Sequence, residues 1–222
     1  MQWMHSLGLT VKSEFITPWG ICDLVGLSFK KGSVAQRRRL GQHEAISSIS
    51  RAAIMLRIPD AETNHSITLA RLVREFAPVI LPETIIEETR RLEAAGFVRR
   101  VRGGQLQKLN GWAPLWKRFM AVELKLTRIE EAMSQAQNNL AFAAESYIAL
   151  PEEVAIRVGE KRERWDGYFA SGVGLLAVTH KSCRIVIQSR PCDLFNADQS
   201  VQFYCVEKFW RSYSKDLKTV NH

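Results

Sequence analysis

The chain has 222 residues, which is long enough for one large domain or two small ones. Its composition, 46% hydrophobic and 24% charged, is that of an ordinary soluble globular protein, and no apolar run approaches the roughly 20 residues that span a bilayer. The formal net charge of +8 at pH 7 favours a polyanionic partner. Four widely spaced cysteines without a Cys-x-x-Cys motif indicate reduced thiols in a cytoplasmic protein rather than a disulfide framework or a zinc site: Cys22, Cys183, Cys192 and Cys205.

The first thirty residues predict two strands joined by a turn at Pro18-Trp19-Gly20. The second strand, ICDLVGLSF, carries Asp23 as the lone acid on a face whose other members are apolar. The same alternation puts Cys22 on the opposite face as an ordinary core residue. For Asp23 taken alone, a strand-end acid paired with a nearby Lys or Arg is an equally good interpretation.

Residues 35–110 are mainly helical in pattern and predict three helices followed by a hairpin. Apolar residues recur at helical spacing up to Ile58, and Ser66 can cap the next helix after a polar break. Pro82 suits the first turn of the third helix and Gly96 its C-terminal cap. The run FVRRVRGGQLQKL then predicts two short strands about Gly103-Gly104.

Three helices followed by a hairpin is the layout of a winged helix. The run RRLEAAGFVRRVRGG resembles the end of the recognition helix and the wing of winged helix-turn-helix regulators, which implies a DNA-binding domain at residues 35–110. Basic side chains of the third helix and the wing are then candidates for phosphate contact, with a merely solvated basic face as the alternative. These candidates are Arg90, Arg91, Arg99, Arg100, Arg102 and Lys108.

The stretch from Phe119 to Pro151 predicts a buried strand, an amphipathic helix and a second strand. Alternation places Glu123 and Lys125 side by side on one face of the first strand. Burying charge is costly unless the charges pair or bind a metal, so this face requires an explanation. Such a pair can supply a metal-binding carboxylate and a cation that holds a water, whereas an isolated Glu-x-Lys also fits a solvated edge strand. Gln135 lies beside the apolar stripe of the helix.

After Pro151 the chain predicts a charged helix, two paired strands and a closing helix, so the fold class is α/β. Asp23 in GICDLVGL and the Glu-x-Lys of VELK together resemble the motif of the PD-(D/E)xK nuclease superfamily. The run AMSQAQNNLAFAAESYIALP is similar to the segment that follows the motif in Holliday-resolvase and RecB-like members. The resemblance implies a restriction-endonuclease-like mixed sheet flanked by helices, built from residues 1–34 and 111–222. The winged-helix domain at 35–110 would be inserted between the two motif strands.

The resemblance also implies a metal-dependent endonuclease that hydrolyses DNA phosphodiesters. Asp23, Glu123 and the backbone carbonyl of Leu124 would hold Mg²⁺ or Mn²⁺. Lys125 would orient the attacking water and stabilise the transition state, and Gln135 would position Lys125 or the scissile backbone. DNA is the expected partner, no membrane is expected, and a homodimer is left open. The alternatives are a DNA-binding regulator that keeps the fold without cleavage and a ligand-responsive winged-helix transcription factor whose α/β part is a sensor.

Overall fold

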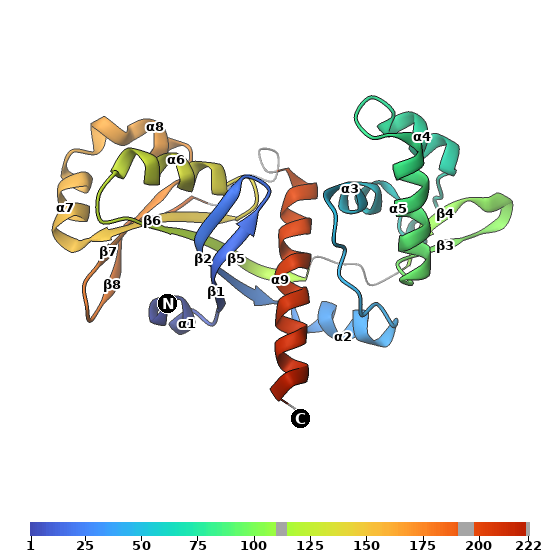
Figure 1. Ribbon diagram of the computed structural model, residues 1–222, viewed down its shortest axis with the longest axis horizontal. Helices are drawn as coiled ribbons and strands as arrows, with labels where there is room; N and C mark the ends of the chain where they lie inside the picture. The colour runs from blue at the N-terminus through green and yellow to red at the C-terminus, as the bar shows by residue number, and fades with distance from the viewer. Residues whose placement is uncertain (110–114, 191–197, 221–222) are drawn as a thin grey trace. The chain divides into compact units, whose positions relative to one another are not determined.

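The computed structural model describes residues 1–109, 115–190 and 198–220 (Figure 1). The chain divides into two compact units, and both are discontinuous in sequence. The first unit combines Met1–Phe29 with Trp116–Gln202, and the second combines Lys30–Leu115 with Phe203–His222. The insertion therefore begins and ends close to the predicted 35–110, but the sequence assigned all of 111–222 to the first unit.

A six-stranded mixed sheet forms the first unit, in the order β1-β2-β5-β6-β7-β8. β1, β2 and β5 pair antiparallel, β5, β6 and β7 pair parallel, and β8 returns antiparallel to β7. The expected mixed α/β sheet is thus confirmed. The strands are β1 (Thr10–Thr17), β2 (Gly20–Phe29), β5 (Trp116–Leu124), β6 (Glu145–Pro151), β7 (Gly174–Val178) and β8 (Cys183–Ile187).

Helices lie on both sides of this sheet (Figure 1). α1 (Gln2–Ser6), which the sequence did not predict, lies on one side. The other side carries α6 (Ile129–Asn139), α7 (Glu152–Glu160), the 3-10 turn η3 (Arg162–Trp165) and α8 (Asp166–Ala170). α6 connects β5 to β6, and α7 to α8 connect β6 to β7, because parallel neighbours require a crossover connection.

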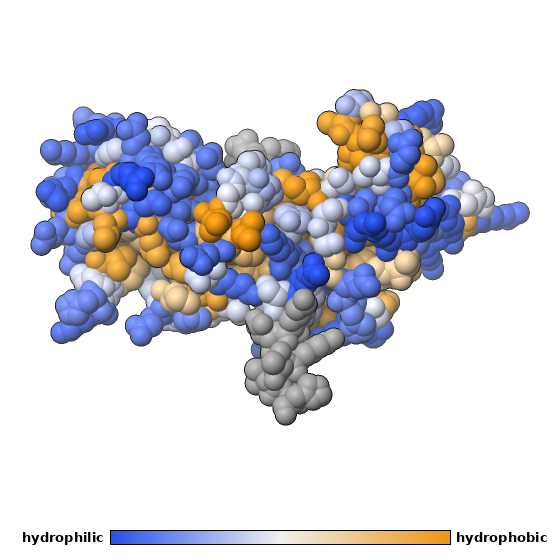
Figure 2. All heavy atoms as spheres, in the orientation of Figure 1, coloured by the Kyte–Doolittle hydropathy of each residue, from blue (hydrophilic) through white to orange (hydrophobic). Residues whose placement is uncertain are grey.

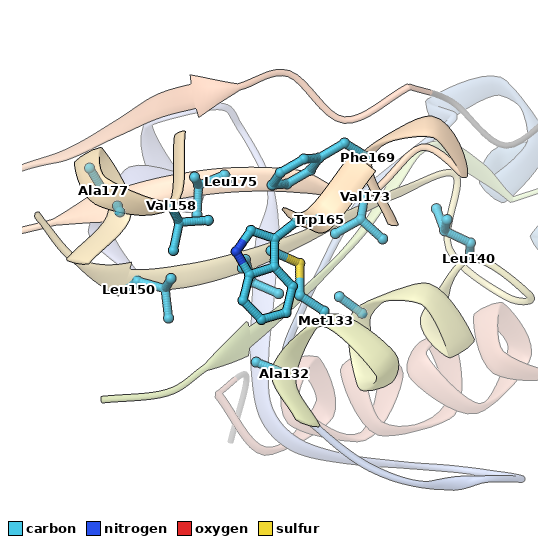
Figure 3. Packing of buried hydrophobic residues seen from close by; sticks show 13 residues of the cluster. Ala132, Met133, Leu140, Leu150, Val158, Trp165, Phe169, Val173, Leu175 and Ala177 are labelled. Atoms are coloured by element: carbon cyan, nitrogen blue, oxygen red, sulfur yellow. The ribbon is translucent and has the colours of Figure 1, made fainter. Parts of the chain in front are cut away.

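Each face of the sheet has its own apolar core. Figure 3 shows Trp165 and Phe169 packed over Met133 of α6 and over the inward residues of β6 and β7. On the opposite face Met4 of α1 packs with Val122 and other buried residues. Alternating side chains of the strands supply both cores, and each large side chain removed from water contributes roughly 1.5–3 kcal/mol.

Short helices and one hairpin make up the second unit. Its core is a cluster of buried apolar residues from α3, α4, α5 and the hairpin, against which Phe203 and Tyr204 pack. The elements are α2 (Lys31–Arg39), α3 (Ile49–Arg57), η1 (Ala61–Thr63), α4 (Leu69–Phe76), α5 (Pro82–Ala94), β3 (Val98–Arg100), η2 (Arg102–Gly104), β4 (Leu106–Lys108) and the part of α9 (Gln199–Val220) from Phe203 onward.

Helix boundaries in this unit differ from the sequence pattern in two places. The predicted first helix is two helices, because Ser48 caps α3 by accepting a hydrogen bond from the Arg51 N–H at 3.0 Å. Thr68, rather than Ser66, caps α4. The hairpin turn is as predicted, since Gly103 (φ 75°) and Gly104 (φ 70°) both adopt the left-handed region that glycine tolerates.

A buried ion pair explains why α9 belongs to the second unit from Phe203 onward. Glu207 accepts a hydrogen bond from Arg37 at 2.5 Å and another from the Ile46 N–H at 3.1 Å. Arg37 and Glu207 are only 1% and 2% exposed. Removing one partner would leave the other charge buried and uncompensated, which is strongly destabilising.

Among the described residues, no helix combines the length and the apolar character needed to cross a membrane. Cys22 and Cys205 are buried free thiols, and Cys183 is a partly buried one. Cys192 lies outside the described residues.

Candidate functional site

The sheet brings Asp23 and Glu123 together from positions a hundred residues apart. The β2–β5 register pairs Leu24 with Val122, so the next residues along the two strands, Asp23 and Glu123, lie opposite each other. Asp23 Oδ2 accepts a hydrogen bond from the Leu124 N–H at 2.7 Å. The three residues that the sequence proposed as metal ligands therefore meet at one end of β5.

Glu123 is buried, with only 2% of its surface exposed. Its Oε1 accepts a hydrogen bond from Asn139 Nδ2 at 2.6 Å. Burial raises the pKa of Glu123, and the charge of Asp23 and a hydrogen bond between the two carboxyl groups raise it further. Asn139 and Cys22 oppose this change by donating hydrogen bonds to the carboxylate. The pair therefore favours a shared proton or a bound cation.

Cys22 belongs to this cluster, so the prediction that placed it on the opposite face was wrong. Asn139 Nδ2 donates to Cys22 Sγ at 3.5 Å, and burial followed by the nearby charge of Glu123 raises the pKa of the thiol. The backbone is irregular at this point: Glu14, opposite Asp23, has a left-handed conformation with φ 50°. Simple strand alternation does not hold across such an irregularity.

Lys125 follows directly after β5. Its N–H donates to the Ala149 carbonyl at 3.2 Å, which continues the contact with β6 past the end of the strand. The side chain is half-buried and lines a cavity of about 280 Å³ together with Thr179 and His180. No described acid forms an ion pair with its ammonium, which leaves this group available to a ligand.

Asn139, rather than Gln135, is the side chain of α6 that contacts the carboxylate pair. Gln135 is half-buried on α6, and its Oε1 is buried without a hydrogen-bond partner among the described residues. In the part of the chain that the structure describes, no hydrogen bond joins it to Asp23, Glu123 or Lys125. Asn139, one helical turn later on the same face, contacts Glu123 instead. The four-residue spacing from Gln135 was the signal that could have identified Asn139.

We expect Asn139→Ala to raise the pKa of Glu123 further and to weaken a cation held by the pair, because the carboxylate loses a charged hydrogen bond worth roughly 1.5–3 kcal/mol. The rise in Tm across a Mn²⁺ titration measures the affinity of the pair for the cation. Asn138→Ala is the matched control, since Asn138 is the exposed neighbour on α6. Equal Mn²⁺ dependence in the Asn139 variant and the wild type would contradict the assignment.

The predicted DNA-contacting side chains of the second unit have very different surroundings. Several arginines already pair with glutamates of α5: Arg90 and Arg91 each bind Glu87, at 2.9 Å and 3.0 Å, and Arg100 binds Glu93 at 2.7 Å. The remaining candidates are Arg99, which donates to Gln107 at 3.2 Å, exposed Arg102 on the hairpin turn, and Lys108, which is buried with its ammonium 3.6 Å from Asp60.

The start of α5 is apolar and acidic rather than basic. Val79 and Leu81, in the turn before α5, are 82% and 71% exposed, and Glu83 follows them. Figure 2 shows hydrophobic residues gathered over this turn and hydrophilic residues at the hairpin tip. The hairpin is therefore the better place for phosphate contact.

The carboxylate pair fits a hard divalent cation. Mg²⁺ takes oxygen ligands, keeps several waters and is commonly bound through one or two carboxylates. Within the described part of the chain, no three side chains of His, Cys, Asp or Glu lie close enough to hold a metal. A cation would thus take the carboxylates of Asp23 and Glu123, the Leu124 carbonyl and solvent.

The comparisons with known proteins assign no family to this arrangement. No protein-family model matches the chain, and neither a curated protein nor a solved structure matches it.

Proposed function

We propose that the first unit hydrolyses DNA phosphodiesters with the help of a divalent metal ion. The observation that carries this proposal is the meeting of Asp23 on β2 with Glu123 on the neighbouring strand β5, with Lys125 two residues further on. Only 2% of the Glu123 surface is exposed. Keeping its carboxylate ionised opposite a second carboxylate costs free energy unless a cation or a proton offsets the charge. A lysine beside them, with an ammonium that can stabilise charge developing on a phosphate, suits chemistry on a phosphodiester.

The order of the strands supports the same proposal. The aspartate strand β2 runs antiparallel to the Glu-x-Lys strand β5, and α6 then leads to the parallel strand β6. A mixed sheet, with a helix and a strand after the Glu-x-Lys strand, is what the resemblance to PD-(D/E)xK nucleases implies. The positive net charge of +8 suits a polyanionic substrate.

Each residue has a distinct role in the proposed reaction. Asp23, Glu123 and the Leu124 carbonyl would hold the cation, while Asn139 fixes the Glu123 carboxylate. A bound Mg²⁺ would neutralise charge on the phosphate and lower the pKa of a coordinated water. Lys125 holds that water and stabilises the charge that develops on the phosphate oxygens.

The second unit is proposed as a winged-helix DNA-binding domain. Its three helices α3, α4 and α5, followed by the β3–β4 hairpin, support this reading. Phosphate contacts would come from the hairpin, where Arg102 is exposed at the turn and Arg99 lies on β3. Lys108 is excluded from this surface because it is buried.

Changing Arg99, Arg100 and Arg102 together to Ala should weaken DNA binding across all sequences. It should also flatten the dependence of affinity on salt by about 0.9 in slope for each lost phosphate contact. Fluorescence anisotropy at several salt concentrations measures both. Arg71→Ala in α4 is the control, because Arg71 is also an exposed arginine of this unit but lies outside the hairpin. An unchanged slope in the triple variant would remove the hairpin from the DNA surface.

The function is tested by incubating the protein with supercoiled, linear, single-stranded and branched DNA, with Mg²⁺, with Mn²⁺ and with a chelator. We expect cleavage that needs the metal and is lost in Glu123→Gln. Protein that binds DNA but leaves every form intact with both metals would contradict hydrolysis and favour the DNA-binding regulator.

A further inference from the structure

A groove of about 790 Å³ lies on the face of the first unit's sheet that carries α1. Apolar side chains of neighbouring strands form its floor, among them Leu24, Val122 and Leu176. Trp3 of α1 contributes one wall, and the turn between β7 and β8, with His180 and Lys181, contributes the other. The size and the apolar floor are typical of a small-molecule or nucleotide site.

This groove adjoins the proposed catalytic lysine. The 280 Å³ cavity that Lys125 lines shares Leu124, Ala149 and Val178 with the larger groove, together with Thr179 and His180. Both cavities therefore reach Leu124 at the end of β5, and the N–H of this residue donates a hydrogen bond to Asp23. The groove lies on the α1 face and Glu123 contacts α6 on the other face, so the two are neighbours only at this end of β5.

Two leucines beside the carboxylates are left in contact with solvent. Leu124 is 45% exposed and Leu126 is 79% exposed, and both line the cavity at Lys125. Single exposed leucines are common on protein surfaces. Leu124 and Leu126, however, line one cavity together with Lys125, which lies between them in sequence. This arrangement suits a ligand with an apolar face and a negative charge.

The charge around the groove is complementary to phosphate. Lys125, His180 and Lys181 lie along the two connected cavities, and no acidic side chain lines either of them in the described part of the chain. His180 and Lys181 are exposed on the turn between β7 and β8. The two lysines and the hydrogen-bonding imidazole at the rim, together with the apolar floor, match one nucleotide, whose base is flat and apolar on its faces and whose phosphate is anionic.

We propose that the groove binds an unpaired nucleotide of the DNA strand that is cut, next to the scissile phosphate. The base packs on the apolar floor and reaches Leu126 in the adjoining cavity, and the phosphate lies against His180 and Lys181. A base inside a continuous duplex is stacked on both sides and does not reach such a groove without leaving the stack. The inference rests on the proposed function, and it names the substrate class: single strands, flaps and frayed ends rather than continuous duplex.

The test measures binding in chelator, so that no cleavage interferes. The probes are a fluorescein-labelled thymidine oligonucleotide of about 12 residues, an abasic oligonucleotide of the same length and the fully paired duplex. The wild type should bind the thymidine strand about tenfold more tightly than the abasic strand, while the duplex reports binding by the proposed winged-helix domain. Leu126→Ser should remove most of this preference, and Lys181→Ala should lower the salt slope by about 0.7.

Two controls accompany these variants. Ile185→Ser changes a 40% exposed apolar residue of β8 outside both cavities and should bind like the wild type. Lys161→Ala, at the exposed end of α7, is the control for charge. Because Leu126 is 79% exposed, its replacement leaves the core unchanged.

Equal binding of the thymidine and abasic strands, or unchanged binding by Leu126→Ser, would overturn the groove assignment. A Leu126→Ser variant that loses a dimer but keeps strand binding would also overturn it and assign the surface to a second copy of the chain. Base-dependent binding by a protein inert with Mg²⁺ and Mn²⁺ would support the groove while removing the proposed hydrolysis. Efficient cleavage without base-dependent binding would remove the groove alone.

Discussion

Replacing Lys125 by alanine should lower the rate of DNA cleavage by on the order of 10²–10³ and leave DNA affinity nearly unchanged. The residue follows the end of β5 and lies two positions from Glu123. Its ammonium is assigned to charge that develops on the phosphate only in the transition state, so the loss appears in the rate of the chemical step. Its half-buried side chain borders a cavity rather than a packed core, so the fold should persist.

Single-turnover cleavage with saturating protein separates this effect from binding. Lys125→Arg keeps the positive charge but changes its shape, and it should retain part of the activity. Lys161→Ala, in the same unit and exposed, should cut like the wild type. Should Lys125→Ala cut at the wild-type rate, the chemistry assigned to the end of β5 would be incorrect.

Local patterns predicted the central part of the first unit well. The stretch from Phe119 to Pro151 was expected as strand, helix and strand, and it forms β5, α6 and β6. Alternation in the strands and helical spacing in α6 are properties of neighbouring residues, so a short window of sequence contains them. The hairpin about Gly103-Gly104 was predictable for the same reason, because two glycines permit the left-handed turn.

Contacts between distant parts of the chain were not predictable in this way. The assignment of residues from Phe203 onward to the second unit depends on Glu207, which meets Arg37 and Ile46 more than 150 positions away. The sequence around Glu207 resembles any amphipathic helix and carries no sign of its partner. α1 was also missed, since a five-residue helix shows too few turns for a periodic pattern.

In the candidate site, too, some features were predictable from the sequence and others depended on long-range contacts. Proximity of Asp23 and Glu123 was an expectation from the resemblance, and the register of β2 with β5 places them opposite each other. Asn139 and Cys22 escaped prediction because their contacts with Glu123 depend on the rotation of α6 over the sheet and on the irregular backbone at Glu14. Those are tertiary features that no pattern of strand alternation contains.

In chelator, Asp23→Asn should raise the free energy of unfolding by about 1–2 kcal/mol, or a few degrees in Tm. The substitution removes a negative charge that faces buried Glu123, and the asparagine oxygen can still accept the hydrogen bond from the Leu124 N–H. Asp166→Asn is the matched control, because Asp166 is exposed in the same unit and should change Tm little.

The free energy of unfolding should depend on pH because the pKa of Glu123 is raised in the folded protein. Folded protein keeps the Glu123 proton at a pH where the unfolded chain has already lost it. The unfolded state therefore binds fewer protons, and the free energy of unfolding falls as pH rises from the ordinary carboxyl range through the raised pKa. Asp23→Asn should reduce this fall in stability, since the charge of Asp23 contributes to the raised pKa.

Without metal, Asp23→Asn should be more stable than the wild type, and adding Mg²⁺ or Mn²⁺ should make the wild type the more stable protein. A cation held by both carboxylates stabilises only the folded wild type, by about 2.7 kcal/mol when its concentration is 100 times its Kd. Asp23→Asn has lost one ligand and should gain far less. Calorimetric scans of both proteins with increasing metal measure the difference, and zinc-free buffers keep the Cys22 thiol from acting as a competing ligand. Identical metal-induced shifts in the wild type and Asp23→Asn would mean that the cation binds elsewhere, and the two carboxylates would then require a structural explanation.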